Sequence, residues 1–463
     1  MAFSAEIIIL IVTVGLFAAV FACASRLAAP VFFCMLLFAS SISSPVEAGF
    51  YRPLTWIGPI QTYRNYLFVA AGFLLLLNLF VQGRHYRPFG APVNVYCMIG
   101  VGLWMGLMIA VQGDPIQGIL TAVAAAISLG GVAMLLNQTR DYRASMWLFV
   151  GSIFAVTCLI NLVIIGQFAI NPRVLLSSEW SRRFQGLTGN PQFLGAQLAM
   201  IITVCLWMLL NKTKRWVLFA LIPILGLNSL FLLWTGSRTA IGMCVIGVSI
   251  VLFSRFKQAA LGLPVAAAAV AVAYKLVGSL LTDVDTSRIA SLENTRRGAW
   301  TRLLEIYAQN PLIGAGLEDG AVDKSENSFL YGLAAYGTGM GLLYALAIIT
   351  TGTLVLRMLM VRRKADIQLK GMIDLVIALN ATFFAGTILE GYFIGRVNVL
   401  IILFVGINAV GYQIVRQLAA VQSYTVPLAD EQDEYQPDTV QSETGPQNKP
   451  ERGDRPNYAE LAF

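Results

Sequence analysis

The chain has 463 residues, of which 57% are apolar and 12% are charged, and its mean hydropathy is +0.70. Soluble domains carry about twice this share of charged residues, so the composition excludes a string of soluble domains and indicates one helical bundle in a lipid bilayer. The formal net charge of +7 comes from basic residues in short segments between apolar runs, so we expect no nucleic-acid partner.

The apolar runs are long enough to cross the bilayer core as helices, which takes about 20 residues each. We predict about 12–13 such spans, at 5–24, 27–42, 66–82, 94–111, 117–137, 145–168, 192–210, 216–234, 238–254, 259–281, 328–356, 372–392 and 397–415. The run at 328–356 is long and rich in glycine, which indicates a broken or re-entrant start. The expected fold is an all-α polytopic membrane protein.

Basic residues in the short loops predict the orientation, because Lys and Arg are enriched on the cytoplasmic side. With alternating spans, the following residues share that side: Arg84, Arg87, Arg140, Arg143, Lys212, Lys214, Arg215, Arg255, Lys257, Arg362, Arg363, Lys364 and Arg416. The longest polar interval, 282–327, is then one large extracytoplasmic loop. The polar segment 422–463 is a cytoplasmic tail whose low apolar content predicts disorder.

Two arginines on the predicted outer side indicate an anionic ligand. Arg183 follows Arg182 in one loop, and Arg238 follows Ser237 in the sequence TGSRTA at 235–240. Gly, Thr and Ser nearby let the backbone approach a ligand closely, and guanidinium groups suit phosphate oxygens. These features predict a site for a membrane-borne phosphate or diphosphate. Three further arginines on this side are better explained by contact with lipid headgroups: Arg173, Arg288 and Arg302.

Within the large loop, residues 295–309 have helical periodicity, and Asn310-Pro311 would end the helix. The apolar residues expected on one face are Trp300, Leu303, Leu304 and Tyr307. Such a helix lies either in the membrane plane or against the bundle. We expect it to pack on the bundle and to play no catalytic part itself.

Four motifs in this order resemble the O-antigen ligase family and its Wzy-type polysaccharide polymerase relatives. They are GLTGNPQFLG (186–195) preceded by Arg183, TGSRTA (235–240), RRGAW (296–300) with NPLIGAG (310–316), and ENSFLYGLAAYGTG (326–339). The resemblance implies a glycosyltransferase-C-like bundle. The chain then divides into N-terminal spans 1–144, a ligase-like core 145–360, C-terminal spans 361–421 and the tail 422–463.

The resemblance also implies a reaction in cell-surface polysaccharide assembly at the inner (plasma) membrane. A glycan moves from an undecaprenyl-diphosphate carrier to an acceptor hydroxyl, which belongs to lipid A-core in ligases and to the next repeat unit in polymerases. Arg183 and Arg238 match the arginines that hold the diphosphate. Asn190 and Pro191 match the helix-start motif beside it, and Arg297 and Trp300 match the loop-helix motif. Arg183 and Arg238 are therefore the expected catalytic arginines, which neutralise the charge that grows on the departing diphosphate. The further residues expected to bind substrate are Arg182, Asn190, Ser237, Arg297, Trp300 and Asn327.

The chain departs from the family at one position that matters for mechanism. The family commonly has His-Asn where this chain has Glu326-Asn327, and the only histidine, His85, falls on the predicted cytoplasmic side. Glu326 is therefore the expected acceptor base. The alternatives are that Glu318 or Asp319 takes this role, or that Glu326 is a solvated carboxylate at a helix start.

We expect no metal and no organic cofactor, because the arginines supply the positive charge that a metal would otherwise provide. Asp283 and Asp285 form the nearest Asp-x-Asp pair, but nothing beside them completes a metal site. Glu390 lies near the outer end of a span, with Arg396 six residues later. We interpret it as half of a structural ion pair between neighbouring segments.

The competing hypothesis is a membrane transporter or flippase for a small anion or a polysaccharide precursor. Polar residues within the predicted spans, such as Asn78, Asn161 and Asn380, would suit it. The sequence has no recognisable inverted repeat, and its polar residues gather toward one side. Convergence of Arg183, Arg238 and Glu326 on one outward cavity open to lipid would favour the transferase, and a wide separation of the three would argue against it.

Overall fold

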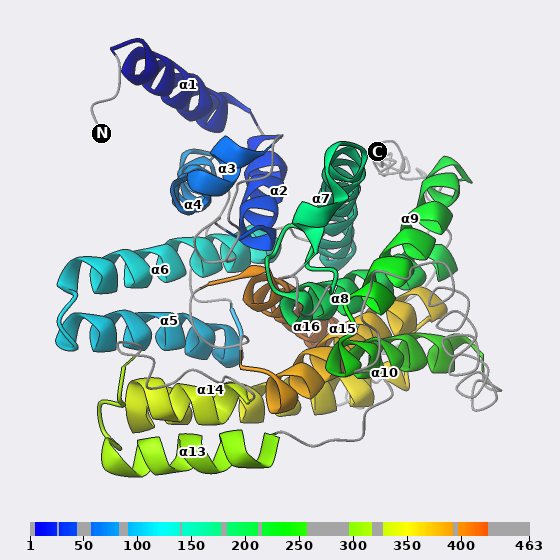
Figure 1. Ribbon diagram of the computed structural model, residues 1–463. Helices are drawn as coiled ribbons and strands as arrows, with labels where there is room; N and C mark the ends of the chain where they lie inside the picture. The colour runs from blue at the N-terminus through cyan, green and yellow to red at the C-terminus, as the bar shows by residue number, and fades with distance from the viewer. Residues whose placement is uncertain are drawn as a thin grey trace, which may run out of the picture. The chain divides into compact units, whose positions relative to one another are not determined.

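The computed structural model describes residues 5–25, 27–43, 57–82, 91–138, 141–176, 183–211, 215–256, 296–316, 327–391 and 397–424. Within these ranges the chain is helical apart from connecting turns and one isolated antiparallel bridge between Leu176 and Phe184 (Figure 1). The predicted all-α class is confirmed for them. The chain divides into a unit 1–418, described below, and a unit 419–463 of which only the end of the last helix is described.

The helices agree closely with the predicted spans in position. They are α1 (Ala5–Ala24), α2 (Ala28–Ser41), α3 (Gly58–Thr62), α4 (Arg64–Val81), α5 (Val93–Val111), α6 (Pro115–Gln138), α7 (Tyr142–Ile170), η1 (Pro172–Leu175), α8 (Pro191–Leu210), α9 (Arg215–Trp234), α10 (Arg238–Arg255), α13 (Arg296–Gln309), α14 (Ser328–Arg362), α15 (Ile367–Leu389) and α16 (Val399–Tyr424). The short elements α3 and η1 were not predicted. The predicted span 259–281 lies outside the described residues.

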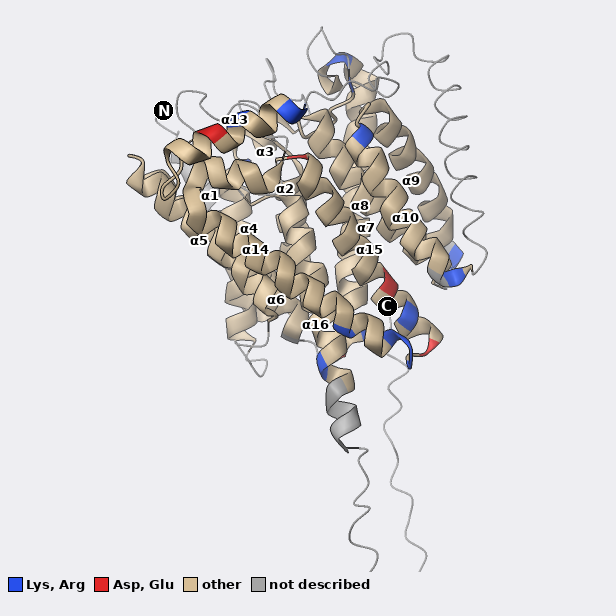
Figure 2. Cartoon of the chain, turned by 90° about the horizontal axis from the view of Figure 1, so that it is seen from below, with Lys and Arg blue, Asp and Glu red and all other residues tan. Residues whose placement is uncertain are grey.

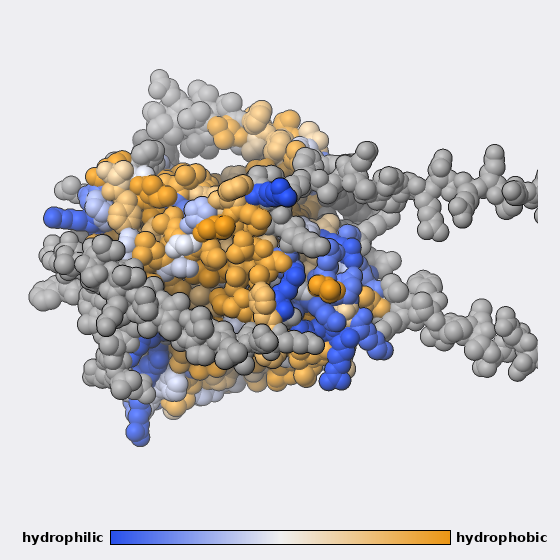
Figure 3. Space-filling model, turned by 90° about the vertical axis from the view of Figure 1, so that its right-hand side faces the viewer, coloured by the Kyte–Doolittle hydropathy of each residue, from blue (hydrophilic) through white to orange (hydrophobic). Residues whose placement is uncertain are grey.

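Nine of the described helices are long and apolar enough to cross a membrane: α4 to α9 and α14 to α16. Three shorter apolar helices, α1, α2 and α10, occupy further predicted spans. Hydrophobic side chains cover much of the described surface on the face shown in Figure 3, with hydrophilic residues gathered toward its edges. The chain is therefore a multi-pass membrane protein, with α8, α15 and α16 mainly buried and α4 and α9 mostly on the surface.

Charged residues lie toward the ends of the spanning helices, whose middles are nearly free of them in the described part of the chain (Figure 2). At the end where α14 meets α15, Arg362 Nε donates to Asp374 Oδ1 over 2.6 Å. At the same end Arg143 Nη2 lies 3.6 Å from Asp366 Oδ2. The opposite end of the bundle carries the starts of α4, α8, α10 and α13.

Small residues let α5 and α6 approach closely. Gly102 and Gly106 are spaced four apart on α5 and face Ala125, Ala122 and Gly118 of α6. A Cβ atom on Gly106 would overlap the backbone of α6. In lipid, where no hydrophobic force drives helices together, such close contact supplies the packing energy.

A buried polar network joins four helices. The side-chain amide of Asn94 on α5 donates to Thr351 on α14 and to Asn408 on α16, both over 2.8 Å. The Asn408 amide donates in turn to Asn380 on α15 over 2.9 Å. All four side chains are at most 1% exposed, so their hydrogen bonds fix the mutual register of these helices.

The helix α14 is broken near its start, as the glycine content of this run predicted. Gly337 has φ 77° and ψ −172°, which interrupts the helix. The turn after α13 crosses the break: Ala315 N–H donates to Ala334 O and Thr338 N–H donates to Pro311 O, both over 2.8 Å. Backbone groups released by the break are thus satisfied inside the protein, as a membrane environment requires.

Candidate functional site

A cleft of about 740 Å³ lies between α10, α13 and α15. Its lining consists of Arg238, Thr239, Gly242, Met243, Ile246, Arg296, Arg297, Trp300, Thr301, Leu304, Ala385 and Leu389. The volume falls in the range typical of ligand-binding pockets. Three predicted site residues from two separate motifs, Arg238, Arg297 and Trp300, therefore line one cavity.

The cleft combines positive charge with an apolar wall. Arg238, Arg296 and Arg297 contribute three guanidinium groups, and no Asp or Glu is among the described residues that line it. Arg238 and Arg296 also begin α10 and α13, so two positive helix ends point toward the same region. The remaining wall is largely apolar, with Met243, Ile246, Leu304, Ala385 and Leu389. Such a lining suits an anion that carries a hydrocarbon chain.

The tight turn before α10 places Arg238. Gly236 has φ 60°, a conformation that glycine adopts without strain. Ser237 is the N-cap of α10, and its hydroxyl accepts a hydrogen bond from Ala240 N–H over 3.3 Å. Ser237 is 3% exposed, so its side chain positions the helix start, and the exposed Arg238 follows directly at the cleft.

The start of α8 lies beside the start of α10. Asn190 is the N-cap of α8, with its Oδ1 accepting from Gln192 N–H and Phe193 N–H over 2.8 and 3.2 Å. A Cβ atom on Gly195 would come within 2.6 Å of the Ala240 methyl group. The GNPQFLG motif therefore supports the α10 turn through a cap and a close glycine contact.

Arg183 lies behind the α10 turn and is not among the residues that line the cleft. It is 7% exposed, and its Nε donates to Thr235 O over 2.7 Å. Its neighbour Phe184 stacks on Phe231 at 4.8 Å between ring centroids and donates its N–H to Trp234 O. This places the guanidinium of Arg183 in direct contact with the turn that carries Arg238.

The loop helix α13 is held at both ends. Arg296 Nη2 donates to Thr239 Oγ1 over 2.8 Å and lies 3.6 Å from Glu390 Oε1. Near its other end, the hydroxyls of Tyr307 and Thr338 are 2.9 Å apart. The prediction that this helix packs on the bundle is confirmed.

One detail of the predicted apolar face is wrong. Leu303 is buried as expected, but Leu304 is 49% exposed and lines the cleft. Ala299 takes a buried position instead. The helix faces the bundle on one side and the cleft on the other. Some of its apolar residues therefore pack on the bundle, and others line the cleft.

Asn327 ties the start of α14 to the end of α15. Its Oδ1 caps α14 by accepting from Leu330 N–H over 3.0 Å, and its Nδ2 donates to Ile388 O over 2.8 Å. Ser328 Oγ donates to Glu390 O over 2.5 Å. Asn327 therefore positions the chain beside the Arg296–Glu390 pair. Several predicted residues lie outside the described part of the chain: Glu326, Arg182, Glu318, Asp319, His85, Asp283, Asp285 and Arg396.

Two residues of this region were not among the predicted site residues. The prediction included Arg297 but not its neighbour Arg296, although both belong to the RRGAW motif. Glu390 was expected to form an ion pair, and Arg396 was the nearby basic residue noted in the sequence. In the structure Glu390 pairs with Arg296 of the loop helix. Its burial, at 2% exposure, is the signal that an acid near a span end needs a partner.

The described residues include no group of three or more His, Cys, Asp or Glu that would hold a metal ion. No protein-family model matches the chain, and no curated protein matches its sequence.

Proposed function

We propose that this membrane protein transfers a glycan from an undecaprenyl-diphosphate carrier to an acceptor hydroxyl, as the resemblance to O-antigen ligases and Wzy-type polymerases implies. The observation that supports this most is the cleft itself. Arg238, Arg296 and Arg297 stand beside Trp300 and an apolar wall. A lipid-linked glycan diphosphate offers the matching groups: two phosphates, a sugar ring and a polyprenyl chain.

The proposed mechanism is a direct displacement at the anomeric carbon of the donor sugar. The bond from this carbon to the diphosphate oxygen breaks, and a bond from the acceptor oxygen to the same carbon forms. Arg238 and Arg297 stabilise the negative charge that grows on the departing diphosphate. Trp300 provides an aromatic face for the sugar, and Arg183 supports the turn that presents Arg238.

The acceptor hydroxyl must lose its proton as the new bond forms. We assign this step to Glu326, which precedes Asn327 in the sequence, as a general base. The acceptor is a glycan or a lipid-linked glycan. Glu390 has a different part in this scheme: its carboxylate holds Arg296 at the cleft.

We place the cleft on the extracytoplasmic side of the plasma membrane and the tail in the cytoplasm. This orientation follows from the basic residues at the opposite end of the bundle, which include Arg143, Arg255 and Arg362. Lys and Arg are enriched on the cytoplasmic side of short loops.

The test is transfer by purified protein reconstituted with an undecaprenyl-diphosphate-linked glycan and an acceptor glycan. Arg238→Ala and Arg297→Ala should each lower the transfer rate by about 10²–10³-fold, the usual loss when one donor to a developing anion is removed. The transfer rate is measured as the amount of product that mass spectrometry detects over time.

Arg302→Ala is the matched control, because Arg302 is exposed on the same helix as Arg297 and does not line the cleft. It should keep the wild-type rate within about twofold. If Arg238→Ala and Arg297→Ala both transferred the glycan at the wild-type rate, the proposed site would be rejected. Flux of the glycan lipid across the membrane without any transferred product would favour a flippase.

A further inference from the structure

The arginine cleft continues inward along one face of α10. Its lining on this helix includes Arg238, Gly242 and Ile246, which are spaced four residues apart and therefore share a face. At 1.5 Å per residue, Gly242 lies about 6 Å and Ile246 about 12 Å along the helix from Arg238. The cleft thus leads from charged groups at the end of the bundle to apolar groups two turns along an apolar helix.

Gly242 leaves this part of the cleft open. No heavy atom lies within 4 Å of the position that its Cβ atom would take, and the residue is exposed. Ile246, one turn further, is 39% exposed. The inward part of the cleft is therefore a groove with room for further atoms beside Gly242.

The facing helix, α15, also has a small side chain at this level. Thr382 Oγ1 donates to Met243 O over 3.4 Å, which places Thr382 beside the residue that follows Gly242. Ala385 comes about one turn later on α15, toward the end at which α10 begins, and it lines the cleft. Gly242 and Ala385 thus leave a gap of small side chains between α10 and α15.

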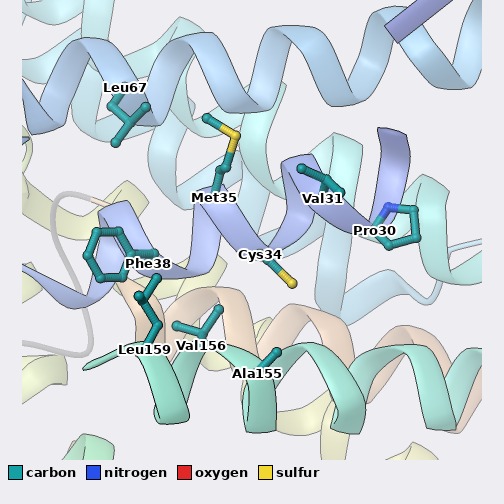
Figure 4. A pocket seen from close by; sticks show the side chains of 9 residues that line it. All are labelled: Pro30, Val31, Cys34, Met35, Phe38, Leu67, Ala155, Val156 and Leu159. Carbon is teal, nitrogen blue, oxygen red and sulfur yellow. The ribbon is translucent and has the colours of Figure 1, made fainter. Parts of the chain in front are cut away.

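The groups at the outer end of this groove suit an anion. Arg296 is held by Glu390, and Arg238 and Arg297 line the cleft at the starts of α10 and α13, where the helix dipoles add positive potential. A second cavity, of about 360 Å³ between α2, α4 and α7, is lined by apolar and sulfur-containing side chains alone (Figure 4). The arginine cleft differs from it by joining guanidinium groups to an apolar groove, as a lipid-linked diphosphate requires.

From the gap of small side chains one turn inside the arginines, we propose that Gly242 is a specificity-determining residue for the hydrocarbon chain of the donor. The chain passes between Gly242 and Ala385 and lies against Ile246, while the diphosphate stays at Arg238 and Arg297. This assignment rests on the proposed donor, a lipid-linked diphosphate, and not on the transfer step. A larger side chain at position 242 would block the path of the chain and leave the diphosphate position unchanged.

The test is binding of two probes to the full-length protein in detergent, measured by isothermal titration calorimetry. Undecaprenyl diphosphate and ethyl diphosphate share the charged group and differ in the chain. Gly242→Leu should raise the Kd of undecaprenyl diphosphate about tenfold, the contribution of about two buried methylene groups, and should change the Kd of ethyl diphosphate by less than about twofold. Arg297→Ala should weaken the binding of both probes.

Ala385→Leu fills the same gap from the facing helix. It should have the effect of Gly242→Leu, and it repeats the test if Gly242→Leu fails to fold. Gly226→Leu is the matched control, because Gly226 on α9 is also an exposed helical glycine with no heavy atom within 4 Å of its Cβ position, and it does not line the cleft. It should bind both probes as wild type does.

An unchanged Kd for undecaprenyl diphosphate in a folded gap variant would overturn the role of Gly242, and so would an equal loss of affinity for both probes. Failure of wild type to bind undecaprenyl diphosphate would overturn this role and the proposed donor together. If wild type showed the expected chain-dependent binding but transferred no glycan, the groove would stand and the proposed transfer would fall.

Discussion

At the scale of single residues, the pair of Glu390 and Arg296 determines how charge is placed at the cleft. Glu390 is 2% exposed, and its carboxylate lies 3.6 Å from Arg296 Nη2. A buried carboxylate is costly without a partner, and removing one member of such a pair leaves the other uncompensated. The pair therefore joins the loop helix to the end of α15 and holds one guanidinium group beside Arg297.

Glu390→Gln tests this role. The substitution removes the negative charge and keeps the shape, so the free energy of unfolding should fall by about 1–2 kcal/mol. Part of the usual loss for a buried pair is screened because Arg296 is 30% exposed. Thermal unfolding in detergent measures the change. Glu305→Gln, at an exposed position on α13, should stay within about 0.5 kcal/mol of wild type, and an equal loss in both variants would argue against the pair.

At the scale of elements, the broken start of α14 decides where the loop helix sits. The turn after α13 occupies the gap at Gly337, and Trp104 Nε1 on α5 donates to Tyr336 O over 3.0 Å. The break, the turn and α5 thus form one packed unit. The loop helix reaches the cleft because this unit fixes its C-terminal end and the Arg296–Glu390 pair fixes its N-terminal end.

Gly337→Ala tests the break. Its φ of 77° and ψ of −172° fall in a region almost confined to glycine, and a Cβ atom there would overlap Leu312 O. Backbone strain alone should lower the free energy of unfolding by about 1–3 kcal/mol. Chemical unfolding in mixed micelles measures it. Gly352→Ala is the control on the same helix, because nothing lies within 4 Å of its Cβ position; it should be neutral or stabilising, and equal effects would contradict this account.

At the scale of the whole molecule, the arrangement of polar residues distinguishes the two hypotheses for function. The arginine cleft lies at one end of the bundle, where α10 and α13 begin. The asparagines deeper in the bundle, Asn94, Asn380 and Asn408, bond to one another and to Thr351. These three side chains hold helices together, which favours a surface reaction over a transport path through them. Asn161, which is also buried, has no hydrogen-bond partner among the described residues.

The proposed orientation leads to a labelling prediction. Gln309→Cys, on α13, should react with a membrane-impermeant maleimide in intact spheroplasts, and Gln368→Cys, at the start of α15, should react only after permeabilisation. Both positions are exposed, and they lie at opposite ends of the bundle. Wild-type protein, which has neither added cysteine, measures the background labelling of the native cysteines, and these lie in apolar helices. The reverse labelling pattern would invert the orientation.

The helical class, the positions of most spans, the loop helix near 295–309 and the break in the 328–356 run were all predictable from the amino-acid sequence. These features are local, because apolar length, periodicity and glycine content act within one segment. The sequence also grouped Arg238, Arg297 and Trp300 through their resemblance to family motifs, and these three residues line one cleft.

How these parts combine became visible in the packed bundle and could not be predicted from the sequence. The tertiary structure placed Arg183 behind the Thr235 turn, turned Leu304 toward the cleft and paired Arg296 with Glu390. Each of these outcomes depends on which helices pack together, and residues far apart in the chain carry no local signal of that. Burial and charge pairing depend on neighbours in space, and the packing of the bundle sets which neighbours meet.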